Sequence, residues 1–75
     1  MLTNIKYENV RVEMSRNNIS KLDISRLIGM NRDTLSRKLS GKAKLYLNEA
    51  FEIRNIVSPH MDIAELFKED TDYAS

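Results

Sequence analysis

Apolar residues recur along this chain at intervals of three and four positions, without long alternating runs of β-branched residues. Only two glycines and one proline punctuate the 75 residues. This pattern predicts an all-α fold: a compact bundle of five short helices, with one domain spanning residues 1–75 and an ordered core at about 7–68. The helices are expected at about residues 7–17, 21–28, 32–39, 47–57 and 61–68.

Each predicted helix carries an apolar stripe that is expected to face a shared core. The positions assigned to these stripes are Tyr7, Val10, Met14, Ile24, Leu27, Ile28, Leu35, Leu39, Leu47, Ala50, Ile53, Val57, Ile63, Leu66 and Phe67. Phe51 and Ile56 are expected at the edge of the fourth stripe. All five helices therefore contribute to the predicted core.

The second predicted helix has a clear start and a clear end. Ser20 and Asp23 stand at capping-box spacing, so each side chain can accept a hydrogen bond from the backbone N–H of the other residue. Ile19 and Ile24 have the spacing of a hydrophobic staple around that start. Gly29 follows the last helical residue, where a left-handed conformation commonly ends a helix.

The third predicted helix begins only three residues after the second ends. Asn31 is a favourable N-cap, and Gly41 stands where it can close the helix at the other end. A three-residue connection that opens with glycine is typical of the helix-turn-helix motif, and the small residue Ser25 is expected where the helices approach most closely. Residues 32–39 are then the predicted recognition helix.

The outward face of this third helix is predicted to be entirely polar. With Leu35 and Leu39 turned inward, the helical wheel places outward Asp33, Thr34, Ser36, Arg37 and Ser40. Arg32 lies nearer the core side, but in the first turn, which is the end that enters the major groove in this motif. Arginine can donate two hydrogen bonds to guanine, aspartate can accept from cytosine, and serine suits either edge.

The distribution of charge also favours a nucleic-acid partner. The chain has 12 Lys or Arg and 11 Asp or Glu, and a net charge of +1 taken alone argues against nucleic-acid binding. However, residues 1–45 hold ten basic and four acidic residues, whereas residues 46–75 hold two and seven. Between positions 21 and 44, seven basic residues stand against two acidic ones, which suits a phosphate backbone.

Residues 20–44, SKLDISRLIGMNRDTLSRKLSGKAK, resemble the DNA-binding domain of the phage Cro and lambda-repressor-like helix-turn-helix family. The similarity continues through residues 48–53 and 62–67, and the chain is similar in particular to small stand-alone phage regulators. The resemblance implies a five-helix domain that binds double-stranded operator DNA as a homodimer. It also implies a transcriptional regulator, such as a repressor, in the cytoplasm of a bacterial host, associated with the nucleoid.

The resemblance assigns roles to individual residues. It implies base-reading positions at Arg32, Asp33 and Arg37, and phosphate-contacting positions at Lys21, Lys42 and Lys44. On their polar chemistry and position, we add Ser36 to the base-reading residues, and Asn31 and Lys38 to the phosphate contacts. The sequence departs from the family at Ser25, which replaces alanine, at Lys38, which replaces an aliphatic residue, and at Tyr46. Because Tyr46 replaces a capping Ser or Thr, the fourth helix is expected to start more loosely.

Other functions find little support in the sequence. The chain has no cysteine, and its one histidine, His60, has no partner for a metal site. No arrangement of Ser, His and Asp marks a nucleophile, so no enzymatic activity, cofactor or small-molecule substrate is expected. No apolar run approaches the roughly 20 residues of a membrane span, so no membrane partner is expected.

The sequence leaves open whether the partner is DNA or a protein, and where a homodimer contact lies. Helix-turn-helix joints also occur in proteins that bind no nucleic acid, so the alternative function is a protein-interaction module, antirepressor-like or antitoxin-like. For the homodimer, Tyr73 and the fifth helix are candidate contacts, although the apolar residues of that helix also suit the core of the monomer.

Overall fold

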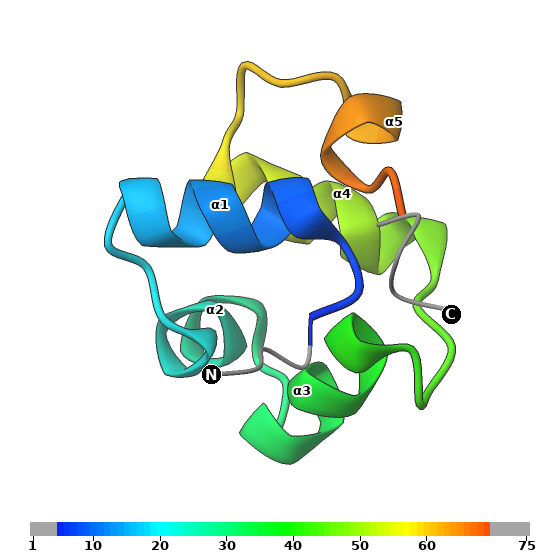
Figure 1. Ribbon diagram of the computed structural model, residues 1–75. Helices are drawn as coiled ribbons and strands as arrows, with labels where there is room; N and C mark the ends of the chain where they lie inside the picture. Colours follow the sequence, from blue (N-terminus) through cyan, green and yellow to red (C-terminus); the bar gives the residue numbers. More distant parts are fainter. Residues whose placement is uncertain (1–4, 70–75) are drawn as a thin grey trace.

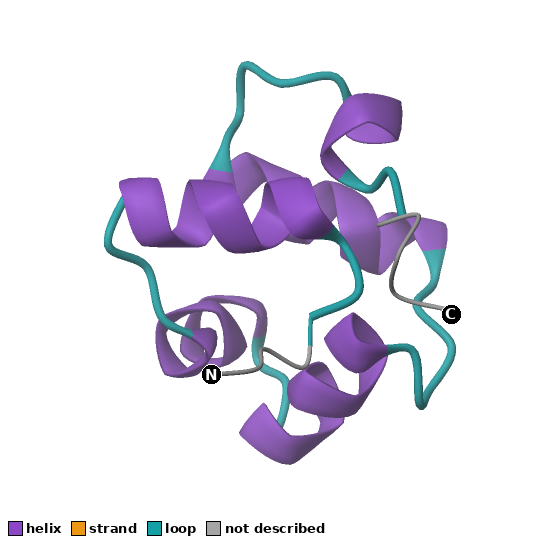
Figure 2. Cartoon of the chain, viewed as in Figure 1, coloured by secondary structure: helices purple, strands orange, loops and turns teal. Residues whose placement is uncertain are grey.

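The computed structural model describes residues 5–69, and within them all regular structure is helical (Figures 1 and 2). The helices are α1 (Glu8–Arg16), α2 (Lys21–Ile28), α3 (Arg32–Ser40), α4 (Leu47–Val57) and α5 (Ile63–Leu66). The predicted all-α class with five helices is therefore confirmed, and the first four helices match their expected bounds within one residue. Tyr73, a predicted dimer contact, lies outside the described residues.

The helices form two groups that meet at the core. α1, α4 and α5 pack against one another, while α2 contacts α4 and carries α3 beside it. Figure 1 shows α2 almost along its axis and α3 running across the view, so the two helices cross steeply. α3 is the outermost of these helices, because among the described helices its backbone lies close only to α2. One long side of α3 is thereby left open to solvent.

A single apolar cluster holds these elements together. Its fully buried side chains are Val10, Ile24, Leu35, Leu39, Ile53, Val57 and Leu66. Tyr7 and Met14 are buried as predicted, and Tyr7 meets Phe67 edge to face with ring centroids 5.2 Å apart. The core also begins earlier than the predicted residue 7, because Ile5 is buried in it.

Three residues assigned to the core or its edge are exposed instead. Leu27 and Leu47 are each 68% exposed, and Phe51 is 40% exposed. In α4, the buried stripe runs through Ala50, Ile53 and Val57, and Leu47 lies about 90° around the helix from its centre. Leu27 is displaced in the same way from the buried face of α2. The prediction that Leu27 and Leu47 face the core was therefore wrong.

The fifth helix is shorter than predicted. It covers Ile63–Leu66 rather than 61–68, because Asp62 ends the preceding loop as an N-cap whose carboxylate accepts from the N–H of Ala64 at 3.1 Å. Leu66 is fully buried, whereas Ile63 is only partly buried. None of the helices in the described part of the chain combines the length and apolar character that a membrane span requires.

The connection from α2 to α3 is fixed by local hydrogen bonds and one glycine. Ser20 Oγ accepts from Asp23 N–H at 3.1 Å and Asp23 accepts from Ser20 N–H at 2.9 Å, which confirms the predicted capping box. Gly29 ends α2 in the left-handed region, at φ 72°. Asn31 Oδ1 then accepts from the N–H groups of Asp33 and Thr34 and starts α3. The whole reversal takes three residues.

We predict that Leu39→Ala lowers the free energy of unfolding by about 2–5 kcal/mol, because it empties a fully buried site where α3 meets the core. Leu27→Ala removes the same atoms from an exposed site and is expected to change stability by less than about 0.5 kcal/mol. Urea unfolding followed by circular dichroism measures both values. Equal losses for the two variants would contradict the burial described above.

Candidate nucleic-acid interface

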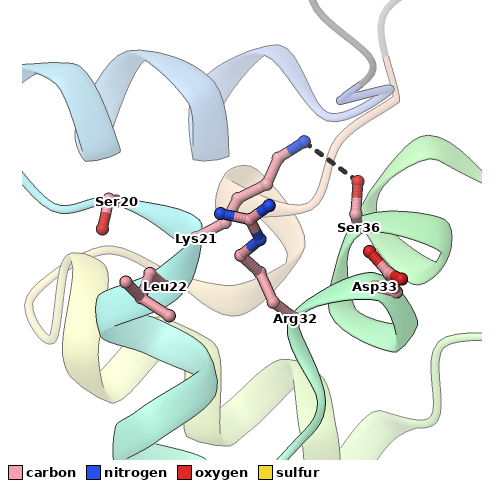
Figure 3. Close-up of a pocket in the computed structure, with 6 residues that line it drawn as sticks. All are labelled: Ser20, Lys21, Leu22, Arg32, Asp33 and Ser36. Atoms are coloured by element: carbon pink, nitrogen blue, oxygen red, sulfur yellow. Dashed lines mark hydrogen bonds between the residues drawn. The ribbon is translucent and has the colours of Figure 1, made fainter.

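A pocket of about 330 Å³ opens where the start of α2 meets the first turns of α3 (Figure 3). The lining residues are Ser20, Lys21 and Leu22 from the start of α2, and Arg32, Asp33 and Ser36 from α3. Three of the four predicted base-reading residues therefore share one cavity with a predicted phosphate contact. The pocket faces solvent on the open side of α3.

The positions of these side chains follow from the helix starts. Arg32 and Ser36 are four residues apart and so lie on one face of α3, one turn from each other. Asp33 stands in the first turn, where its carboxylate is favoured by the positive end of the helix dipole. The short reversal through Gly29 sets the first turn of α2 opposite this face.

A hydrogen bond crosses the pocket. Lys21 Nζ donates to Ser36 Oγ at 3.2 Å, which joins the first residue of α2 to the middle of α3. Figure 3 shows the lysine side chain stretched across from α2 toward the serine. The bond orients the ammonium of Lys21 and uses the serine oxygen as an acceptor, while the serine hydroxyl keeps its own proton to donate.

The other predicted contact residues lie around the pocket rather than in it. Arg37 is exposed on α3, and Lys42 and Lys44 are exposed in the loop that follows α3. The N–H of Lys42 donates to Arg37 O at 2.9 Å, so this loop is held against the end of the helix. Asn31 uses only Oδ1 as a cap, and among the described residues its side-chain amide nitrogen makes no hydrogen bond.

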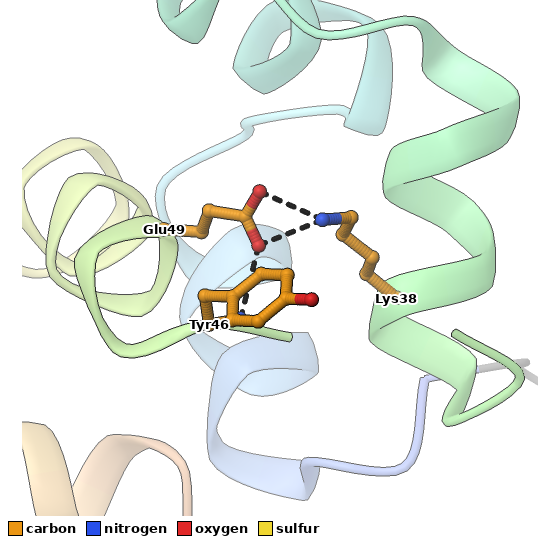
Figure 4. Close-up of polar contacts among 3 residues, drawn as sticks. All are labelled: Lys38, Tyr46 and Glu49. Atoms are coloured by element: carbon orange, nitrogen blue, oxygen red, sulfur yellow. Dashed lines mark hydrogen bonds and ion pairs between the residues drawn. The ribbon is translucent and has the colours of Figure 1, made fainter. Parts of the chain in front are cut away.

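Lys38, a predicted phosphate contact, is turned away from this surface. Its Nζ lies 2.7 and 2.8 Å from the carboxylate oxygens of Glu49 and 5.2 Å from the ring centre of Tyr46 (Figure 4). The side chains of Lys38 and Glu49 are only 12% and 16% exposed. Lys38 thus joins α3 to the start of α4, and we remove it from the phosphate contacts.

The start of α4 depends on the same carboxylate. Tyr46 provides no side-chain cap, as predicted, but Glu49 accepts from the N–H of Tyr46 at 3.0 Å in its place. Partial burial raises the pKa of Glu49, but the hydrogen bonds from Lys38 and Tyr46 and the lysine charge outweigh this effect and hold the pKa below its usual value. Glu49 is therefore an ionised anchor for both helices.

Ser40 was assigned to the outward face of α3, and this prediction was wrong. The residue is buried, and its hydroxyl donates to Arg37 O at 3.0 Å. The segment before α1 covers this end of the helix, because Lys6 N–H donates to Leu39 O at 2.8 Å. The outward polar face of α3 is therefore confined to its first two turns.

Ion pairing separates the cations of the chain into two groups. Lys6, Arg11, Arg16 and Lys38 each lie within 4.0 Å of a carboxylate, on Glu69, Glu8, Glu13 and Glu49 respectively. The other eight have no such partner among the described residues. Two of them, Arg54 and Lys68, lie on and after the last two helices, and six lie between positions 21 and 44: Lys21, Arg26, Arg32, Arg37, Lys42 and Lys44. The unneutralised positive charge is therefore concentrated on α2, α3 and the loop after α3.

This surface presents hydrogen-bond donors, hydrogen-bond acceptors and positive charge. No group of three or more His, Cys, Asp or Glu side chains in the described part of the chain is arranged to hold a metal ion. His60 is exposed in the loop before α5.

Comparisons with known proteins leave the resemblance as a prediction. No protein-family model, curated protein or solved structure matches the chain.

We predict that the contribution of Glu49 to stability disappears at low pH. Since folding lowers its pKa, the stabilisation is complete above the unfolded value of about 4.5 and is lost as the pH falls through the lower folded value. Unfolding free energies measured between pH 7 and pH 3 should show wild type falling toward Glu49→Gln. Glu52→Gln, at an exposed site on the same helix, is the control. A constant difference between wild type and Glu49→Gln across this range would contradict the ionised anchor.

Proposed function

We propose that this protein is a sequence-specific double-stranded DNA-binding regulator of transcription of the Cro and repressor type. In this proposal α2, the three-residue connection and α3 form a helix-turn-helix, and α3 enters the major groove. The observation that carries the proposal is the pocket between α2 and α3, where Lys21, Arg32, Asp33 and Ser36 meet on a surface of unpaired positive charge. The protein acts without catalysis or a cofactor, in the cytoplasm of a bacterial host.

The first two turns of α3 supply the groups that read bases. The guanidinium groups of Arg32 and Arg37 donate to guanine O6 and N7, and the carboxylate of Asp33 accepts from the amino group of cytosine or adenine. Ser36 donates through the hydroxyl proton that its bond with Lys21 leaves in place. These side chains differ in donor and acceptor character, which is what discrimination between base pairs requires.

The phosphate contacts come from residues that flank this face. Lys21, Lys42 and Lys44 carry unpaired charges, and the free side-chain amide of Asn31 adds a neutral donor. The caps at Ser20 and Asn31 occupy some of the N–H groups at the starts of α2 and α3, and the first N–H groups, at Lys21 and Arg32, are left to favour an anion in the same region. Each neutralised phosphate releases counterions, so binding is expected to weaken steeply as salt is raised.

The second partner in the proposal is another copy of the chain. Tyr46, Leu47 and Phe51 are exposed within six positions at the start of α4, and Leu47 and Phe51 share one face of the helix. This patch adjoins the loop that carries Lys42 and Lys44. A two-fold contact there sets Leu47 of one protomer against Phe51 of its partner, and dimers of this kind bind half-sites about 34 Å apart.

The same patch also fits the alternative function, a protein-interaction module. Exposed apolar side chains at Leu47 and Phe51 also suit a protein-interaction module that does not bind DNA specifically. Its contact would use α4, because the outward face of α3 presents no apolar side chain.

Selection of binding sites from random duplex DNA, followed by a salt titration of the selected site, separates the two functions. The proposal predicts enrichment of one sequence, with an affinity that falls as salt rises. Recovery of unenriched sequences, bound no more tightly than random duplex, would favour the protein-interaction module.

On the selected site, we predict different losses for two cation variants. Arg37→Ala should cost about 1–3 kcal/mol and relax specificity at one base pair, whereas Lys42→Ala should weaken all sequences alike and reduce the salt slope by about 1. Arg11→Ala removes an equal charge from α1, where Glu8 already pairs it, and serves as the control. Equal losses on selected and random DNA for Arg37→Ala would refute its base-reading role.

We predict that Leu47→Gln impairs dimerisation and leaves binding to a half-site unchanged. Sedimentation of wild type with the full site should show two protomers per duplex, bound cooperatively, while the variant binds as independent monomers. Leu27→Gln, an equally exposed leucine on α2, should behave as wild type. A wild type that stays monomeric with and without DNA would rule out the homodimer.

A further inference from the structure

The pocket between α2 and α3 contains one apolar side chain that the proposed contacts leave unused. Leu22, the second residue of α2, lines the pocket together with Lys21, Arg32, Asp33 and Ser36. It is 39% exposed, although the rest of the lining is polar or charged. Figure 3 shows Leu22 beside Lys21 on the α2 side of the pocket, across from α3. Leucine in this place has apolar surface that the fold does not bury.

Hydrogen-bond donors next to apolar surface match the edge of one base. In the major groove, thymine presents the acceptor O4 beside a 5-methyl group, whereas cytosine presents an amino donor and no methyl. The pocket provides cationic donors on Lys21 and Arg32 and an apolar surface on Leu22. Asp33 in the same pocket can accept from the amino group of cytosine, so the hydrogen-bonding groups alone do not separate the two pyrimidines. Only thymine presents a methyl group to Leu22, and this apolar contact favours thymine.

The first turn of α2 is held in position for such a contact. The hydrogen bond from Lys21 Nζ to Ser36 Oγ ties the residue next to Leu22 to α3. The capping box between Ser20 and Asp23 fixes the backbone on both sides of Leu22. The leucine therefore keeps a defined place relative to the predicted base-reading face.

We propose that the apolar surface of Leu22, beside Lys21 and Arg32, forms a subsite for the 5-methyl group of a thymine in the bound DNA. Sequence is then read by the start of α2 as well as by α3. This inference rests on the proposed DNA binding and adds to it a preferred base and the residue that recognises its methyl group.

The test replaces each thymine of the selected duplex by uracil, which keeps O4 and lacks the methyl group. One replacement is expected to weaken wild-type binding about fourfold, the value of one buried methyl-sized group. Leu22→Ala should bind the thymine and uracil duplexes equally, because the surface that contacts the methyl is gone. Leu27→Ala, an exposed leucine of the same helix outside the pocket, should keep the fourfold difference.

The outcomes separate this subsite from the function on which it rests. Specific DNA binding in which no uracil replacement weakens the complex overturns the subsite alone. A fourfold loss that persists in Leu22→Ala likewise assigns the methyl contact to another residue and overturns the subsite. Failure of wild type to select any duplex overturns the proposed function, and the subsite with it. Circular dichroism confirms that each variant is folded.

Discussion

The arrangement of this protein depends on how tightly the chain reverses between α2 and α3. Three residues connect the two helices, and the left-handed conformation of Gly29 makes so short a connection possible. Ile24 and Leu35 are then buried in one cluster, while the start of α2 is set beside the first turns of α3. A residue with a Cβ at Gly29 would carry the steric cost of a positive φ, which glycine avoids. The pocket is thus a consequence of backbone conformation as much as of side chains.

Charge serves two purposes on the same small molecule. Lys38 and Glu49 are mostly removed from water, where a close pair with additional hydrogen bonds fixes α3 against α4. The cations around the pocket are exposed, or partly exposed at Lys21, and lack carboxylate partners among residues 5–69, so they keep their attraction for an anionic ligand. The near-zero net charge of the chain conceals this division, which depends on which charges are paired.

Much of the fold could be predicted from the sequence because the helix boundaries are set by local contacts. The capping box at Ser20, the glycines at 29 and 41 and the cap at Asn31 all act within a few residues, and the structure has them as expected. The fifth helix, predicted at 61–68, begins instead after the cap at Asp62. The exposure of Leu47 was not predictable in this way, because the face a helix buries depends on its neighbours in three dimensions.

Only part of the candidate site could be predicted from local sequence patterns. Helical spacing identified Asp33, Ser36 and Arg37 as a polar face, but the Lys38–Glu49 pair joins residues eleven positions apart across a loop. The helical wheel gave only a weak indication that Leu22 is exposed, because it places this residue about 110° around α2 from the buried stripe. Its place in the pocket required the relative positions of α2 and α3, which no local pattern specifies.

In the proposed function, the surface formed by α2, α3 and the following loop binds duplex DNA. Titration of ¹⁵N-labelled protein with a short duplex, followed by amide chemical shifts, measures which residues the DNA contacts. Binding through this surface is expected to shift the amides of residues 20–22, 31–37 and 42–44, with α5 unaffected. Shifts confined to α4 and α5, or none at low salt, would contradict it.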